Sequence, residues 1–440
     1  MKAPSLMDKA VASGLVLALA GLFSGLTANT PLGSLKPFDI LIMLITVPCF
    51  MSKNASQYRI SAGLILMIIF YLVCTVPSCI ENDFLYGLRR GIQVMILVSY
   101  GFVLLNVNFA ALNRRHYLAA LAVMSCIVAF NVGWHVANGF LTDWKRLGDP
   151  KSLFIFLPAC VGVGIVLKVL PRNTFTGLVW ALLCVLIMMS GERKALPAFF
   201  LISMAVYLDL RSLRGFALAV AAGLVVVMAA DVILDGYVFR RVDSIFAGSD
   251  ARNDPLYILQ GGIPASLSDA QRKLGIQVAT QLFHDNPIFG SGMESTANYA
   301  RSHFANYPKF LTGVAHNEFW RVLAEHGIFG MVFMLIPIFR TLFLAVMDSV
   351  TFCRVYRQTF YPRCMIIILT PISAYMWSEG SGVEMFALVM LVALLPEIMP
   401  RIAARCLPPP APAASETPIA RRRPSRSVQN ASRGLVAVSS

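Results

Sequence analysis

The stretch AHNEFWRVLAEHGIFG, residues 315–330, ends the only long polar interval in a chain that is otherwise strongly apolar. The polar interval begins near residue 234, and an apolar run begins at residue 319. His316 is therefore predicted to stand where water meets lipid. An imidazole at such a boundary is well suited to accepting and releasing a proton.

Composition sets the class of the protein. Of 440 residues, 57% are hydrophobic and only 14% are charged, which leaves too little polar surface for a soluble globule of this size. The apolar residues form runs separated by short polar breaks, and a bilayer is crossed by roughly 20 residues of helix. We predict an all-α, polytopic integral membrane protein with about twelve transmembrane helices, near 11–28, 38–52, 60–78, 87–105, 117–138, 153–168, 175–190, 195–209, 215–233, 319–346, 364–378 and 382–399.

Topology follows from lysine and arginine, which are enriched in cytoplasmic loops. Their distribution places both termini in the cytoplasm and the long interval outside, as a partly helical periplasmic loop between the ninth and tenth spans. The net charge of +14 is explained by this topology, so no nucleic-acid partner is expected. The expected organisation is 1–233 with nine spans, 234–316 as the loop with an amphipathic helix and the catalytic motif, 317–400 with three spans, and 401–440 as a disordered, basic, Pro-rich cytoplasmic tail.

Metal and disulfide chemistry are not indicated. The long external interval contains no cysteine, and the chain has neither an Asp-x-Asp pair nor two histidines at helical metal-binding spacing. We therefore expect no cofactor and no metal.

Two elements are predicted within the external interval. Leu274, Val278 and Leu282 recur at helical spacing, which indicates an amphipathic helix over about 269–283. Asn286-Pro287-Ile288-Phe289-Gly290-Ser291-Gly292 follows, and its proline and glycines end the helix.

The start of the tenth span carries a recognisable spacing. His316 and Asn317 are followed by nine residues and then by Gly327 and Gly330. This resembles the signature of the O-antigen ligase and polysaccharide polymerase superfamily. The resemblance implies a bacterial membrane glycosyltransferase that uses an undecaprenyl-pyrophosphate-linked glycan as donor. From the residues alone, the two glycines indicate close helix packing.

Other stretches extend the resemblance over roughly residues 30–400. The turn 286–292 is similar to the family's Pro-x-x-Gly-x-Gly element, and Arg272 stands where the family commonly places an arginine. Residues 190–193, ending in Arg193, are similar to a Ser-x-Arg element at the external end of a span. Residues 146–150, which begin with Arg146, match the family more weakly, because they lack the asparagine that often follows the proline in relatives.

The expected chemistry assigns roles to these residues. Arginine pairs with phosphate through a planar fork and stays charged, so the external Arg193 and Arg272 are predicted to bind the pyrophosphate. Arg89 and Arg90 are predicted to lie on the same face. His316 is the predicted general base, which takes the proton of an acceptor hydroxyl.

Three further residues are candidates for orienting the reaction or lining its cavity: Asn317, Arg146 and Arg321. Asn317 is expected to cap the helix or to orient His316. Arg321 and Glu325 are spaced for an i,i+4 ion pair, and structural pairing is the favoured interpretation.

Three functions are compatible with the sequence. The first is an O-antigen ligase in the bacterial inner membrane, with lipid A core as acceptor. The second shares its chemistry: an exopolysaccharide or O-unit polymerase acting on a growing polysaccharide, or a ligase-like enzyme that glycosylates protein. The third is a flippase or transporter for lipid-linked glycans, for which related halves and charges near mid-membrane are expected. The signature spacing favours the ligase.

Overall fold

The computed structural model describes residues 5–22, 28–30, 33–51, 57–81, 84–111, 114–137, 151–190, 195–207, 254, 257, 267–303, 317–355, 360–378 and 382–406. Apart from one short hairpin, the described elements are helices. In chain order they are α1 (Leu6–Leu22), β1 (Ala28–Thr30), β2 (Gly33–Leu35), α2 (Pro37–Met51), α3 (Ala62–Glu81), α4 (Phe84–Asn106), the 3-10 turn η2 (Phe109–Ala111), α5 (Arg114–Ala137), α7 (Lys151–Val166), α8 (Thr174–Ser190), α9 (Ala195–Tyr207), α13 (Leu267–Asp285), α14 (Ser295–His303), α15 (Glu318–Val355), α16 (Phe360–Ser378) and α17 (Gly382–Cys406).

The predicted all-α class is correct except for that hairpin. β1 and β2 pair antiparallel, with Ala28 opposite Leu35 and Thr30 opposite Gly33. They lie between α1 and α2, a connection for which the sequence indicated no strands.

Every predicted span except 215–233, which lies wholly outside the described residues, overlaps a helix, although residue 28 at the end of the first predicted span lies in β1. Among the described residues, four helical segments are long and apolar enough to cross a membrane, namely Leu88–Asn106, Arg114–Trp134, Glu318–Ser349 and Met385–Ile402. Shorter apolar stretches lie in α2, α3, α7, α8 and α9. The count of twelve spans stays a prediction.

Side-chain caps explain where several of these helices begin. The Ser5 hydroxyl accepts from the Asp8 backbone N–H at 3.1 Å, while the Asp8 carboxylate accepts from the Ser5 N–H at 3.0 Å. The Asn173 side chain accepts from the Thr176 N–H at 3.0 Å at the start of α8. Each cap satisfies a backbone donor that the first helical turn leaves free.

α17 is the central helix of the bundle. Of its membrane-length segment, 67% of the residues are buried, against 12% in α5. It packs against α3, α4 and α15, and the Tyr71 hydroxyl of α3 donates to the Phe386 carbonyl at 2.7 Å. Its run from Met385 to Val389 is buried throughout.

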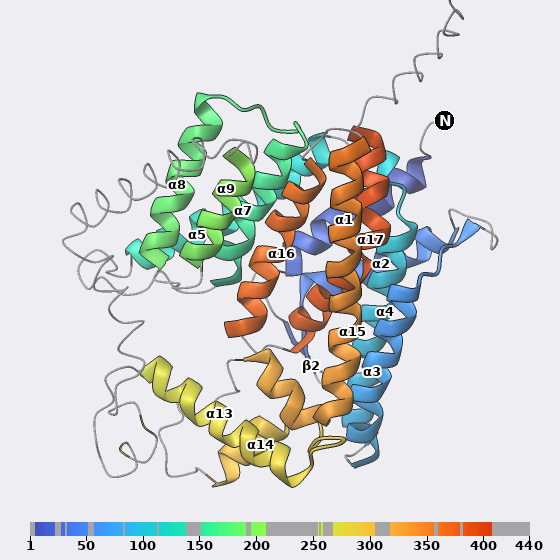
Figure 1. The fold of residues 1–440 in the computed structure, drawn as a ribbon, viewed down its shortest axis with the longest axis vertical. Helices are drawn as coiled ribbons and strands as arrows, with labels where there is room; N and C mark the ends of the chain where they lie inside the picture. Colours follow the sequence, from blue (N-terminus) through green and yellow to red (C-terminus); the bar gives the residue numbers. More distant parts are fainter. Residues whose placement is uncertain are drawn as a thin grey trace, which may run out of the picture.

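The bundle has two distinct ends. The N-terminal end of α1 and the C-terminal end of α17 lie together at one end, and α13 and α14 lie at the other, next to the first turns of α15 (Figure 1). This arrangement brings residues 267–303 and the start of α15 into one unit, in which the candidate site lies.

Candidate functional site

The apolar face of α13 packs against α14 and α15. Leu274, Val278 and Leu282, the residues that predicted an amphipathic helix, are buried with Ala300 of α14 and Ala324 of α15. The helix extends from Leu267 to Asp285, slightly beyond the predicted 269–283. Its apolar stripe is therefore covered by protein, and α13 fixes the position of the start of α15.

The first helical turn of α15 is capped by Asn317. The Asn317 side-chain oxygen accepts hydrogen bonds from the backbone N–H groups of Phe319 at 3.0 Å and Trp320 at 3.2 Å. Such a cap stabilises a helix start by about 1 kcal/mol. Asn317 thereby determines where α15 begins, directly after His316 in the chain.

α15 consists of two helical segments, 318–326 and 328–355, joined at Gly327. Gly327 has φ 64° and ψ −164°, which no helix contains. The predicted span 319–346 is therefore not one continuous helix. Gly327 does allow close packing, but with the turn 286–292 rather than with another helix, since a Cβ on it would collide with the Ile288 carbonyl oxygen. Gly327 also breaks the helix, because glycine reaches positive φ without the steric penalty that a Cβ brings.

The turn 286–292 supplies the hydrogen bonds that the break in α15 leaves open. Ser291 N–H donates to the Ala324 carbonyl at 2.9 Å, and Gly292 N–H donates to the Glu325 carbonyl at 3.0 Å. In the other direction, the Ile328 N–H donates to the Pro287 carbonyl at 2.9 Å. The Pro-x-x-Gly-x-Gly turn and the break are thus one hydrogen-bonded structure.

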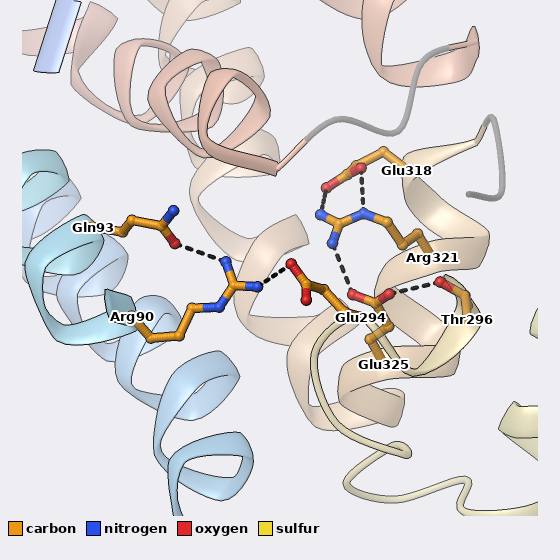
Figure 2. Close-up of polar contacts among 7 residues, drawn as sticks. All are labelled: Arg90, Gln93, Glu294, Thr296, Glu318, Arg321 and Glu325. Carbon is orange, nitrogen blue, oxygen red and sulfur yellow. Dashed lines mark hydrogen bonds and ion pairs between the residues drawn. The ribbon is translucent and has the colours of Figure 1, made fainter. Parts of the chain in front are cut away.

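A buried ionic cluster lies on the first segment of α15 (Figure 2). Arg321 donates from Nε to Glu318 at 2.9 Å and from Nη1 to Glu325 at 2.8 Å, and its Nη2 also pairs with Glu318. The Thr296 hydroxyl of α14 donates to the second oxygen of Glu325 at 2.7 Å. The predicted Arg321–Glu325 pair is confirmed, whereas the partners Glu318 and Thr296 were not predicted.

The stability of this cluster depends on every one of its charges being paired. Glu318, Arg321 and Glu325 are almost fully enclosed. Removing ions from water costs several kcal/mol each, and only good geometry and complete hydrogen bonding offset that cost. The Arg321 guanidinium also lies 5.7 Å from the centre of the Phe386 ring, where the ring face attracts a cation.

A second ion pair joins α4 to the turn that precedes α14. The Arg90 guanidinium donates to Gln93 at 2.7 Å and pairs with Glu294, whose side chain is half exposed (Figure 2). Glu294 has a φ of 65°, rare for a residue with a side chain. The sequence indicated a role for Arg90, because it is predicted to be external whereas lysine and arginine are enriched in cytoplasmic loops. Nothing in the sequence indicated Glu294 as its partner.

The predicted site residues fall into two groups. Asn317, Arg321 and Arg272 are described, with Arg272 partly buried in the second turn of α13. His316, Arg193 and Arg146 lie outside the described residues. The spatial relation of His316 to Arg193 and Arg272 therefore stays a prediction.

Within the described part of the chain, no group of three or more His, Cys, Asp or Glu residues is arranged to hold a metal ion.

Comparison with known families identifies the segment that contains this site. Residues 178–335 match the family model described as O-antigen ligase, a stretch that includes α13, α14 and the first turns of α15. No curated protein matches the sequence. The match agrees with the resemblance indicated by the motifs, and over these residues the chain is similar to the O-antigen ligase family. Together with the apolar helices, it indicates a multi-pass membrane protein with glycosyltransferase activity of the ligase or polymerase type.

Proposed function

We propose that this protein is an O-antigen ligase of the bacterial inner membrane. It transfers a glycan from undecaprenyl pyrophosphate to a sugar hydroxyl of lipid A core at the periplasmic face. The observation that carries this proposal is the family match over 178–335, which spans the unit formed by the turn 286–292, α14 and the start of α15. The signature spacing from His316 to Gly330 supports the ligase in particular.

In the proposed reaction, His316 acts as the general base. The acceptor hydroxyl oxygen attacks the anomeric carbon of the donor sugar while its proton passes to the imidazole, and the bond from that carbon to the pyrophosphate breaks. The lipid pyrophosphate leaves as an anion. Because the acceptor attacks from the side opposite to this leaving group, the configuration at the anomeric carbon is inverted. The Asn317 cap supports this role, because it sets the helix start immediately after His316.

Arg193 and Arg272 are proposed to bind the pyrophosphate, with Arg146 lining the cavity. Arg321 receives a different role. Its guanidinium already bonds two carboxylates, so it is proposed to hold the start of α15 in place rather than to bind phosphate. The reaction as proposed uses no cofactor and no metal.

The membrane orientation belongs to the same proposal. Both termini are placed in the cytoplasm and the 234–316 interval in the periplasm. This agrees with the N-terminal end of α1 and the C-terminal end of α17 lying at one end of the bundle and α13 and α14 at the other (Figure 1). An exopolysaccharide or O-unit polymerase is the alternative, since it shares the donor chemistry and differs in the acceptor.

The deciding experiment is a gene deletion followed by gel analysis of the surface glycans. Loss of long lipopolysaccharide together with accumulated lipid-linked glycan is expected. Normal lipopolysaccharide with loss of a secreted polysaccharide would overturn the ligase and favour the polymerase.

Complementation of the deletion strain tests the mechanism. His316→Ala is expected to abolish glycan transfer at normal protein levels. His303→Ala is the matched control, because His303 is an exposed histidine at the end of α14 whose ring stacks on Tyr299. Full transfer by His316→Ala would remove His316 as the base.

A further inference from the structure

The turn 286–292 has an exposed apolar tip. Ile288 is 53% exposed and Phe289 63% exposed, although both belong to a segment rich in polar and turn-forming residues. The Phe289 ring stacks on Phe329 of α15, with ring centres 5.3 Å apart and planes 24° from parallel. The tip is therefore held against α15.

Backbone hydrogen bonds also hold this tip against α15. The Ile328 N–H donates to the Pro287 carbonyl at 2.9 Å, and the Phe329 N–H donates to the Ile288 carbonyl at 3.2 Å. Exposure of Ile288 and Phe289 is thus a property of an ordered turn.

The tip continues an apolar stripe along the second segment of α15. The exposed large residues of that stripe recur three or four positions apart and lie on one helix face: Phe329, Val332, Ile336, Phe339 and Phe343, with Val346 and Met347 at the far end. In a segment long and apolar enough to cross a membrane, an exposed apolar stripe of this kind is suited to contact with lipid.

The length of the stripe locates the tip relative to the bilayer. From Ile328 to Met347 the helix rises about 28 Å at 1.5 Å per residue. The hydrocarbon core of a bilayer is about 30 Å thick. Asp348 follows directly after the stripe. The two boundaries of the core therefore fall near Asp348 and near Ile328, where Phe289 lies.

We propose that Ile288 and Phe289 insert into the bilayer at its boundary with water and anchor the α13–α14 unit to the membrane. The partner is lipid, because the apolar surface is continuous with the exposed apolar stripe of α15. Aromatic side chains are enriched at this depth of the membrane. The anchor holds the start of α15 at the plane in which a lipid-linked pyrophosphate lies. The insertion itself does not depend on the identity of donor or acceptor.

The anchor is tested by the accessibility of a spin label in lipid nanodiscs. A nitroxide is attached to p-azidophenylalanine placed at position 289, and its collisions with oxygen, which partitions into lipid, and with a water-soluble nickel chelate are compared. Gln277 is the matched control position, since it is exposed on α13 in the same unit. The label at 289 is expected to favour oxygen, and the label at 277 the nickel chelate.

Two results would overturn the proposal. Nickel accessibility at 289 equal to that at 277 would place the tip in water, and low accessibility to both reagents would place it against protein, for example a second copy of the chain. The consequence for transfer is measured with Phe289→Asp, which is expected to lose activity, and Phe289→Leu, which is expected to keep it. Equal transfer by these two variants would show that the anchor does not serve the reaction.

Discussion

Gly290 and Gly327 contact each other backbone to backbone. A Cβ added to Gly327 would lie 2.7 Å from the Gly290 nitrogen, and one added to Gly290 would collide with the backbone where Glu325 joins His326. Both glycines have positive φ, 77° and 64°. The Pro-x-x-Gly-x-Gly turn and the glycine that ends the nine-residue spacing are therefore two halves of one contact.

Replacing either glycine by alanine should disrupt this contact. Gly290→Ala and Gly327→Ala each place a methyl group where there is no space and force a residue with a Cβ into strained backbone, at a cost of order 1–3 kcal/mol from strain alone. We expect a lower melting temperature in detergent and reduced glycan transfer.

Gly177→Ala is the control for this prediction, because a Cβ at Gly177 of α8 meets no atom within 4 Å. A wild-type melting temperature for Gly327→Ala would contradict the backbone contact between Gly290 and Gly327.

Arg321 should be essential for the stability of the first segment of α15. Arg321→Met removes the only guanidinium that the structure describes between Glu318 and Glu325 and leaves buried carboxylates unpaired, which costs about 3–5 kcal/mol. The measurement is thermal unfolding of the purified protein. Adding Glu318→Gln to Arg321→Met should recover part of the loss, and no recovery would argue against a charge imbalance as the cause.

Thr296→Val should uncouple α14 from α15. The substitution keeps the shape of the side chain but removes the hydroxyl that donates to Glu325 at 2.7 Å, at a cost of about 1–3 kcal/mol for the unsatisfied group. Thr296→Ser should retain the bond and the stability. Thr280→Val serves as comparison, because the Thr280 hydroxyl donates to the Ile276 carbonyl within the same helix, α13, and its loss should matter less.

The Arg90–Glu294 pair should contribute less than the buried cluster. The Arg90 side chain is only 6% exposed, but Glu294 is half exposed, so solvent screens this pair more than the fully buried cluster. Glu294→Gln is therefore expected to lower the melting temperature less than Glu325→Gln does. The reverse order would show that the link between α4 and the turn before α14 is the stronger one.

The rate of transfer should rise as the medium goes from mildly acidic to neutral. A general base must be unprotonated to accept the hydroxyl proton, so acid removes the active form of His316. The measurement is the initial transfer rate of the purified protein at saturating donor across this range. A rate that is flat from mildly acidic to neutral would speak against an imidazole base.

The sequence by itself determined the helices of the bundle and the local contacts near residue 316. Long apolar runs become helices in lipid because every backbone polar group must be bonded internally. The Asn317 cap and the Arg321–Glu325 pair followed from spacing within one or two helical turns.

Only the tertiary structure decided how these pieces fit together. Thr296 and Glu325 are 29 residues apart in the sequence, and Arg90 and Glu294 are 204 residues apart, so no local spacing predicts either contact. The break at Gly327 was also hidden, because a glycine in an apolar run is equally compatible with close helix packing. The contacts of the turn 286–292 show that the helix breaks at Gly327, since the turn donates and accepts the hydrogen bonds that a broken helix lacks.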